Sequence, residues 1–183
     1  MTKIAIVFHS GFGHTKVVAE RVKAGAESVP GTQANLIPVE EVEAHWADLE
    51  GADAIVFGSP TYMGSVSGPF KTFMDASSKP WYERKWKDKL AAGFTISGSP
   101  SGDKLNTLQT LIIFAMQHGM VWVGLADLPQ NDEGTNRLGS FSGVMAQAGQ
   151  VAPEVEPNEA DRKSAERLGQ RIATASARWA RVS

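Results

Sequence analysis

Residues 10–16 (SGFGHTK) combine two glycines with hydroxyl-bearing side chains directly before a helical pattern. Glycines let backbone N–H groups converge on one point, and the first turn of a helix adds partial positive charge. Ser10 and Thr15 add two hydroxyl donors. The segment therefore predicts a cradle for a phosphate group. The same residue types also build a tight strand-to-helix turn with a helix cap, so the segment alone leaves both interpretations open.

Several kinds of phosphate site are excluded because the motif residues they require are missing from this segment. Lys16 stands where a dinucleotide-binding fingerprint needs its third glycine, and the Gly-Lys-Ser/Thr of a nucleotide P-loop does not follow. The preceding apolar run ends in Phe8-His9, without the acidic residues that a receiver domain needs. A cysteine-dependent phosphatase is excluded because the chain contains no cysteine. A single terminal phosphate, as on FMN, is the prediction that remains.

Two further segments of similar composition follow later apolar runs. Residues 59–65 (SPTYMGS) and 97–103 (SGSPSGD) are rich in small, hydroxylated and glycine residues. Ligands of open α/β sheets bind outside the carboxyl ends of the strands. We therefore expect the three segments to converge on one edge of a sheet and to form a single site.

The elements that must position these segments alternate along the chain. Five short β-branched runs are predicted as strands, and four longer patterns are predicted as helices. The strands are 4–8, 34–39, 54–57, 91–96 and 121–123, and the helices are 14–28, 69–76, 105–117 and a C-terminal stretch through Leu168, Ile172, Ala175 and Trp179. This alternation predicts one doubly wound α/β domain over residues 1–183, since a β/α barrel would need about 250 residues.

Two stretches interrupt the alternation. Residues 79–89 form a basic, aromatic insert, and residues 125–151 are long and carry almost no regular pattern. Loops of that length in a compact domain are usually functional or disordered. A lid over the ligand and a subunit arm are both open for the second stretch.

Composition excludes several classes of protein. The chain has 18 Lys and Arg against 20 Asp and Glu, a net charge of −2, which disfavours a nucleic-acid-binding domain and a strongly acidic electron carrier. The absence of cysteine removes disulfides, thiolate catalysis, cysteine-ligated zinc and iron–sulfur clusters. No apolar run approaches the ~18 residues of a membrane span, and the N-terminal run is too short for a signal peptide. We expect a cytoplasmic protein without a metal, nucleic-acid or membrane partner.

Three motifs in order resemble those of one flavoprotein group. The Ser-x-x-Gly-His-Thr loop after the first strand is similar to the FMN-phosphate loop of the flavodoxin-like superfamily. Residues 57–75 resemble the second flavin loop and following helix of the WrbA-type NAD(P)H:quinone oxidoreductases and related FMN reductases. Residues 117–120 (QHGM) resemble the His-Gly-Met signature before the last strand of the WrbA group. The resemblance spans roughly residues 1–125.

The resemblance implies a fold, a cofactor and a reaction. The fold is the flavodoxin-like five-stranded parallel sheet, order 2-1-3-4-5, with helices on both faces. The cofactor is FMN, with NAD(P)H as co-substrate delivering hydride to flavin N5 and a quinone or similar acceptor taking both electrons in a ping-pong cycle. Many members form homo-oligomers, so a homodimer or homotetramer is expected.

The resemblance also implies roles for individual residues. His118 would be catalytic by stabilising charge on the reduced flavin or quinone, and Trp81 would bind the substrate. The FMN-binding residues it implies are Ser10, Gly11, Phe12, Gly13, His14, Thr15, Ser59, Pro60, Thr61, Tyr62, Met63, Gly64, Ser97, Gly98, Ser99, Pro100, Ser101, Gly102 and Asp103.

Three positions depart from the WrbA-type pattern. Tyr62 stands where that group usually has Arg, Pro100 has no N–H to donate, and Phe12 lacks the hydroxyl often found there. These departures leave the nicotinamide and acceptor preferences open. Two other functions also stay open: a one-electron flavodoxin-type carrier, and a regulatory domain without flavin. Structural roles are alternatives for His118 as a helix cap, and for Trp81 in a satellite core or subunit interface.

Overall fold

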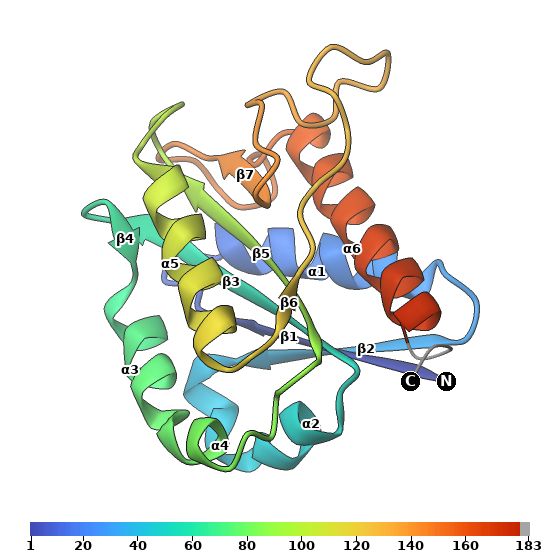
Figure 1. Cartoon of the computed structure of the whole chain (residues 1–183). Coiled ribbons are helices and arrows are strands. Elements are labelled where there is room, and N and C mark those ends of the chain that lie inside the picture. Colours follow the sequence, from blue (N-terminus) through green and yellow to red (C-terminus); the bar gives the residue numbers. More distant parts are fainter. Residues whose placement is uncertain (180–183) are drawn as a thin grey trace.

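The computed structural model describes residues 1–179, so the last four residues of the predicted 1–183 domain lie outside the described part. Its centre is a parallel sheet with helices on both faces (Figure 1). The strand order is β2-β1-β3-β5-β6, formed by β1 (Thr2–Phe8), β2 (Thr32–Pro38), β3 (Ala54–Tyr62), β5 (Leu90–Ser97) and β6 (Val121–Trp122). Counting these parallel strands in chain order gives 2-1-3-4-5, which confirms the predicted flavodoxin-like topology.

The third strand is longer than its apolar run. The sequence places residues 59–62 in a loop, whereas in the structure β3 continues to Tyr62 and then turns back through the short strand β4 (Ser65–Val66). Pairing with β5 as far as Pro60 and Ile96 overrides the weak strand propensity of this Gly-Ser-Pro stretch. A glycine is needed at 58, because a Cβ there would lie 2.0 Å from the Phe94 ring.

The fifth strand position is occupied by two separate pieces of chain. β6 pairs with Leu90 and Ala91 at the start of β5, and β7 (Val144–Gln147) pairs with residues 94–97 at its end. Residues 123–143 leave the sheet between the two pieces (Figure 1). The prediction that 125–151 lacks regular structure is therefore wrong in part, because β7 lies within it.

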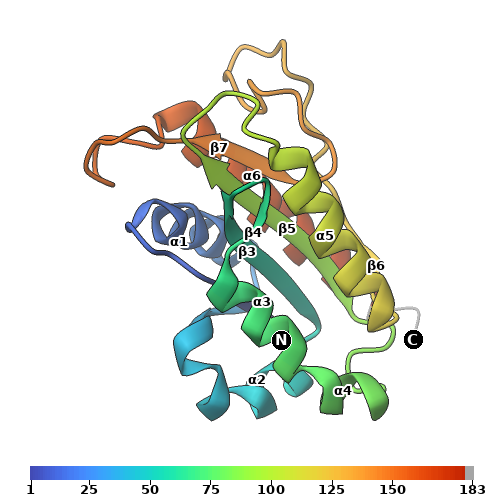
Figure 2. The same cartoon turned by 90° about the vertical axis from the view of Figure 1, so that its left-hand side faces the viewer.

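Alternate residues of the strands face two different cores. Ile4 and Ile6 face α1 (His14–Glu27) and α6 (Glu159–Trp179), while Ala5 and Val7 face the opposite layer. That layer contains α2 (Trp46–Gly51), α3 (Gly68–Ala76), α4 (Ser78–Tyr82) and α5 (Lys104–Gln117), with a 3-10 turn at Val39–Ala44. Figure 2 shows α3 and α5 on one side of the strands and α1 and α6 on the other.

Glycines bring α1 and α6 into close contact. A Cβ on Gly25 would lie 2.0 Å from the backbone oxygen of Glu166, and one on Gly169 would lie 2.0 Å from that of Val22. Each helix therefore presents a glycine to the backbone of the other. This contact fixes the long C-terminal helix, whose first turn holds the segment beside the candidate site.

The basic, aromatic insert divides between core and surface. Trp86 is completely buried and stacks with Trp46 and Phe73, whereas Tyr82 is largely exposed. The insert closes the sheet at the amino ends of the strands. It therefore lies at the opposite edge from the three glycine- and serine-rich segments.

Candidate functional site

A pocket of about 660 Å³ lies at the carboxyl ends of the strands and joins all three predicted loops. Pockets for small ligands and cofactors commonly occupy 300–1,000 Å³, so this volume suits a nucleotide-sized group. The lining residues are Phe12, His14, Thr15, Pro60, Tyr62, Ile96, Ser97, Gly98, Ala148, Gly149, Gln150, Val151 and Ala152. The convergence of loops predicted from sequence is thus observed, and a fourth segment, 148–152, completes the wall.

The first loop presents a row of backbone donors. No backbone N–H from Ser10 to Thr15 finds an acceptor among residues 1–179. Ser10 Oγ accepts from the backbone N–H of Lys16 at 3.1 Å, which draws the loop around the start of α1. Gly13 precedes α1 in a left-handed conformation, φ +88°, and caps the helix with no side-chain hydrogen bond. Free donors at a helix N-terminus match the requirements of a bound phosphate.

His14 connects the first loop to the segment after β7. Its Nε2 lies 2.8 Å from the carbonyl oxygen of Val151, and because a carbonyl only accepts, Nε2 carries the proton. A Cβ on Gly13 would lie 2.7 Å from Cγ of Pro153 in the same segment. His14 lines the pocket, and its ring also anchors the 148–153 segment against the first loop.

Tyr62 closes the pocket from the second loop. Its ring meets that of Phe12 edge-on, with centroids 6.4 Å apart, and its hydroxyl lies 3.0 Å from where a Cβ on Gly11 would stand. Burial raises the pKa of the Tyr62 hydroxyl above its ordinary value of 10, so the group stays protonated at neutral pH. Met63 follows at the fully exposed tip of the turn.

Ser59 and Thr61 support the second loop from below. Thr61 Oγ1 lies 2.7 Å from Thr95 Oγ1 and 2.8 Å from Thr107 Oγ1, in a buried group of three hydroxyls. Ser59 Oγ accepts from the backbone N–H of Ser67 at 3.0 Å. The hydroxyl of Thr61 faces the interior, so the structure gives this side chain no place in the pocket, and the predicted contact of Thr61 with FMN stays a prediction. Neither residue lines the pocket.

The third loop is fastened on two sides. The end of β7 holds it through Ala148 N–H to Ser97 O at 3.2 Å and through the Gln147 side chain to Gly98 O at 3.2 Å. From the interior, the buried ammonium of Lys104 donates to Ser97 Oγ at 2.9 Å and to Ser99 O at 2.7 Å. The exposed stretch 99–101 and Asp103 lie beyond the pocket wall, which Ser97 and Gly98 provide.

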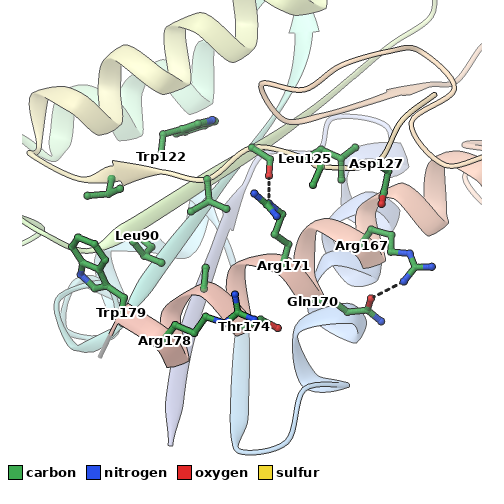
Figure 3. A pocket seen from close by; sticks show the side chains of 15 residues that line it. Leu90, Trp122, Leu125, Asp127, Arg167, Gln170, Arg171, Thr174, Arg178 and Trp179 are labelled. Carbon is green, nitrogen blue, oxygen red and sulfur yellow. Dashed lines mark hydrogen bonds between the residues drawn. The ribbon is translucent and has the colours of Figure 1, made fainter. Parts of the chain in front are cut away.

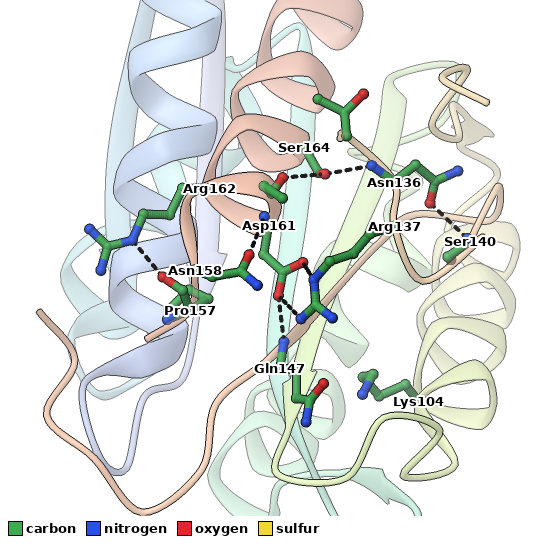
Figure 4. Close-up of polar contacts among 12 residues, drawn as sticks. Lys104, Asn136, Arg137, Ser140, Gln147, Pro157, Asn158, Asp161, Arg162 and Ser164 are labelled. Atoms are coloured by element: carbon green, nitrogen blue, oxygen red, sulfur yellow. Dashed lines mark hydrogen bonds and ion pairs between the residues drawn. The ribbon is translucent and has the colours of Figure 1, made fainter. Parts of the chain in front are cut away.

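An ion pair between a buried carboxylate and a partly exposed arginine holds β7, which leads into the fourth segment (Figure 4). Asp161, in the first turn of α6, is 1% exposed and accepts two hydrogen bonds of 2.8 Å from the Arg137 guanidinium. The same carboxylate accepts from the backbone N–H of Gln147 at 2.9 Å. The 123–143 segment, β7 and α6 thus meet at one carboxylate, directly behind the third loop.

The structure places His118 away from the pocket of its own chain, so its predicted catalytic role stays a prediction. His118 is 1% exposed, stacks on Trp86 at 4.1 Å and shares a 3.0 Å hydrogen bond between its Nε2 and Ser77 Oγ. Burial, with a smaller effect from Arg84, lowers the pKa of His118 from 6.5 to about 4, so the ring is neutral. It ends α5 near the start of β5, whereas the pocket lies beyond the end of β5.

Trp81 also lies away from the pocket of its own chain. It belongs to α4, where its backbone N–H donates to the carbonyl of Ser77, next to His118. Its ring is 42% exposed at the amino ends of the strands. The structure does not bring Trp81 to the pocket of its own chain, so its contact with a substrate stays a prediction. The strand-to-helix geometry explains both positions, because a helix that starts at the carboxyl edge of a parallel sheet ends at the amino edge.

Sequence reasoning missed two parts of the site. The first is the wall at 148–152, which has no motif and falls at the end of a stretch without a regular pattern. The second is Lys104, which was outside the helix predicted at 105–117. Its helical spacing from Leu108, Leu111 and Ala115, all buried, is the signal that places it on the inner face of α5.

A larger groove of about 950 Å³ runs between α6 and residues 121–127 (Figure 3). It contains Leu90 at the start of β5, so it lies toward the edge opposite the three loops. Arg171 crosses it and donates to the carbonyl of Gly124 at 2.9 Å. Its position separates it from the cradle of backbone donors, so it is not the site predicted from sequence.

Two further features bear on the kind of site. Over residues 1–179, His, Asp and Glu side chains nowhere gather in a group of three suited to a metal ion. Within that range, no helix is long and apolar enough to cross a membrane. The pocket presents mainly backbone N–H groups, hydroxyls and aromatic rings, a set that fits FMN.

Comparisons with known proteins agree with this geometry. A protein similar over 157 residues at 43% identity is the flavodoxin FldP of Pseudomonas aeruginosa, with 81% of this chain and 82% of that protein covered. An NAD(P)H dehydrogenase (quinone) of Archaeoglobus fulgidus is 32% identical over 195 residues, covering 94% and 96%. The crystal structure of a flavodoxin, WrbA-like protein from Agrobacterium tumefaciens superimposes with a TM-score of 0.77 at 40% identity, covering 97% and 99%.

The family of this chain is shown by a match between its sequence and the model of a known family. Residues 13–129 match the family described as NADPH-dependent FMN reductase. This range begins in the first loop and includes the second and third loops. The match confirms the predicted family and its cofactor, FMN with NAD(P)H as electron donor. The chain is an FMN-dependent oxidoreductase and belongs to the NADPH-dependent FMN reductase family.

Proposed function

We propose that the pocket at the three loops binds FMN and that the protein passes electrons from NAD(P)H to a quinone by a ping-pong mechanism. One observation carries the placement of FMN: the pocket wall joins the three loops next to six backbone N–H groups for which residues 1–179 offer no acceptor. The phosphate would accept from the N–H groups of residues 10–15, and the ring would lie among Tyr62, Ser97 and Gly98.

The chain's own residues bind and shield the cofactor in this proposal. When bound, FMN supplies the redox chemistry, accepting hydride from NAD(P)H and returning two electrons to the acceptor. The helix N-terminus and hydroxyls of the first loop offset the phosphate charge. The bond from His14 to Val151 holds the 148–152 segment against the pocket and limits the entry of water.

Apolar side chains around the pocket favour an aromatic acceptor. Phe12 is 75% exposed, and Tyr62, Met63 and Val151 are also exposed. Flat aromatic compounds bury apolar area against such rings with favourable edge and face contacts. A quinone has this shape, and the relative from Archaeoglobus fulgidus is named an NAD(P)H dehydrogenase (quinone).

A one-electron carrier is the second candidate, and one observation favours it. The relative from Pseudomonas aeruginosa, at 43% identity, is named a flavodoxin. The net charge of −2 supports the enzyme, because an acidic carrier steers to basic partners through a strong negative field.

Steady-state kinetics separate the two candidates. The purified holoprotein is mixed with NADH or NADPH and a soluble benzoquinone, and nicotinamide oxidation is followed by absorbance. The enzyme oxidises the nicotinamide without any added reductase, and a ping-pong cycle gives parallel double-reciprocal lines. Turnover only after addition of a separate reductase would establish the carrier instead.

We also propose that the chain forms a homodimer or homotetramer, as its resemblance to the WrbA group implies. Large apolar side chains on the outer face of α5, Leu105, Ile113 and Met116, are at least half exposed. Trp81 and Tyr82 add exposed aromatic area at the end of α4. Light scattering on the holoprotein tests this assembly, and a monomer at micromolar concentration would contradict it.

A further inference from the structure

Lys104 is a buried cation placed directly beneath the third loop (Figure 4). It is the first residue of α5 and is completely inaccessible to solvent. Its ammonium donates to Ser97 Oγ at 2.9 Å and to Ser99 O at 2.7 Å, and Ser97 Oγ lies 3.1 Å from the same carbonyl. One amine thus ties both ends of a three-residue bend whose first residue lines the pocket.

The charges around this ammonium come from two other elements. Asp161 of α6 and Arg137 of the 123–143 segment are paired with each other at 2.8 Å and both act on Lys104. Burial lowers the pKa of Lys104 from 10.5 to about 8, Asp161 opposes this change, and Arg137 adds to it. The charge of Lys104 is therefore incompletely balanced and titrates near physiological pH.

We propose that Lys104 is a positioning residue of the FMN site, whose ammonium holds the third loop in its ligand-binding form and supplies the only buried lysine charge next to the pocket among residues 1–179. The inference rests on the proposed placement of FMN. Hydrogen bonds from a charged donor are about twice as strong as neutral ones, and a charge in a low-dielectric interior acts over a longer distance than in water.

This role predicts that the affinity for FMN depends on the charge of Lys104. Below pH 8 the ammonium is charged, and the loop is held by charge-assisted bonds. Above pH 8 the neutral amine still donates, but the bonds weaken and the positive charge disappears. FMN, which carries a phosphate and carbonyl oxygens on its pyrimidine ring, therefore binds more weakly as the pH rises through 8.

The chain offers a matched control in Lys89. Its ammonium also donates to two carbonyls, Glu50 O at 2.8 Å and Ala52 O, and burial also lowers its pKa. Lys89 precedes β5, whereas Lys104 follows it, so the two lysines lie at opposite edges of the sheet. Lys89→Met removes a partly buried amine with a similar bonding pattern, and Lys89 does not line the pocket.

The test is titration of the apoprotein, prepared from the holoprotein, with FMN between pH 6.5 and 9.5, followed by quenching of flavin fluorescence. The wild-type dissociation constant is expected to rise roughly 3- to 10-fold across pH 8, the scale of one charge-assisted bond. Lys104→Met is expected to bind FMN more weakly than wild type at pH 6.5, by a similar factor, and its dissociation constant is expected not to rise with pH. Lys89→Met is expected to keep the wild-type profile.

The outcomes separate this inference from the proposed function. A wild-type affinity that is flat from pH 6.5 to 9.5, or a Lys104→Met affinity equal to wild type at pH 6.5, overturns the role of Lys104 while leaving FMN bound. If Gly13→Ala, which displaces the backbone N–H groups of the first loop, still binds FMN as tightly as wild type, the placement of FMN itself is overturned. If Lys104→Met fails to fold, Ser97→Ala removes one acceptor, and it is expected to weaken binding while keeping the transition near pH 8.

Discussion

Gly13 offers the most direct test of the phosphate cradle. Its φ of +88° lies in the left-handed region, and a Cβ would meet Cγ of Pro153 at 2.7 Å. Alanine at position 13 pays about 1–2 kcal/mol for the left-handed backbone. The contact with Pro153 adds to this, because relief requires movement of the loop or of the 148–153 segment. Either movement displaces the N–H groups of residues 13–15.

A second glycine with nearly the same backbone separates strain from binding. Gly31, between α1 and β2, has φ +79° and nothing within 4 Å of its Cβ position. Gly31→Ala therefore carries the same backbone cost without any contact at the pocket. Both variants are expected to lower the free energy of unfolding by about 1–2 kcal/mol, and Gly13→Ala somewhat more.

FMN affinity is the decisive measurement for this pair. Hydrogen bonds to a charged group contribute about 1.5–3 kcal/mol, so loss of one phosphate contact weakens binding about tenfold or more. Fluorescence titration of the apoproteins is expected to show this loss for Gly13→Ala and wild-type affinity for Gly31→Ala. Equal affinities for the two variants would refute the assignment of the phosphate to the first loop.

Three further predictions concern the framework around the site. Gly25→Ala is expected to destabilise the protein by more than 2 kcal/mol in urea denaturation because the Cβ would overlap α6, whereas Gly51→Ala, with open space at the end of α2, is expected to be neutral or stabilising by up to about 1 kcal/mol. Asp161→Asn removes the buried carboxylate that pairs with the partly exposed Arg137 guanidinium and is expected to cost about 1.5–3 kcal/mol, measured by thermal unfolding; a loss below 1 kcal/mol would contradict the contribution of this pair to stability. The pKa of Lys104 is about 8 in the folded apoprotein against 10.5 in the unfolded chain, so the unfolded state binds more protons between these two pH values. The free energy of unfolding is therefore expected to rise with pH in this range, by up to about 3 kcal/mol. This rise should be absent in Lys104→Met.

The sheet and its loops could be predicted because local patterns and general topology agree. Strands that are apolar on both faces, alternating with helices, leave few arrangements, and the loops after such strands share one edge. The cradle at residues 10–15 needed only the glycines and the helix that follows. These features depend on short stretches of chain, so a single sequence contains most of the information.

The features that the sequence did not predict depend on how distant segments of the chain are placed relative to one another. His118 has a suggestive motif, but α5 carries it to the amino edge of the sheet, where Trp86 covers it. Thr61 follows the right strand, but the pleat points its hydroxyl toward Thr95. Lys104 has an ordinary surface side chain by composition, and only packing against β5, α6 and the 123–143 segment buries its amine. The only local trace of this burial is the helical spacing of Lys104 from buried residues of α5.

The interrupted fifth strand has a consequence for how this protein can change. Trp122 and Val144 pair with Ala91 and Phe94, so the two ends of the 123–143 segment lie only a few residues apart along β5. Joining nearby ends by a longer or shorter chain changes the loop-closure entropy only slowly with length. Insertions and deletions in this segment can therefore accumulate without altering the strand order or the cradle. The carboxylate of Asp161 sets the limit, because a shortened segment must still deliver an arginine to it.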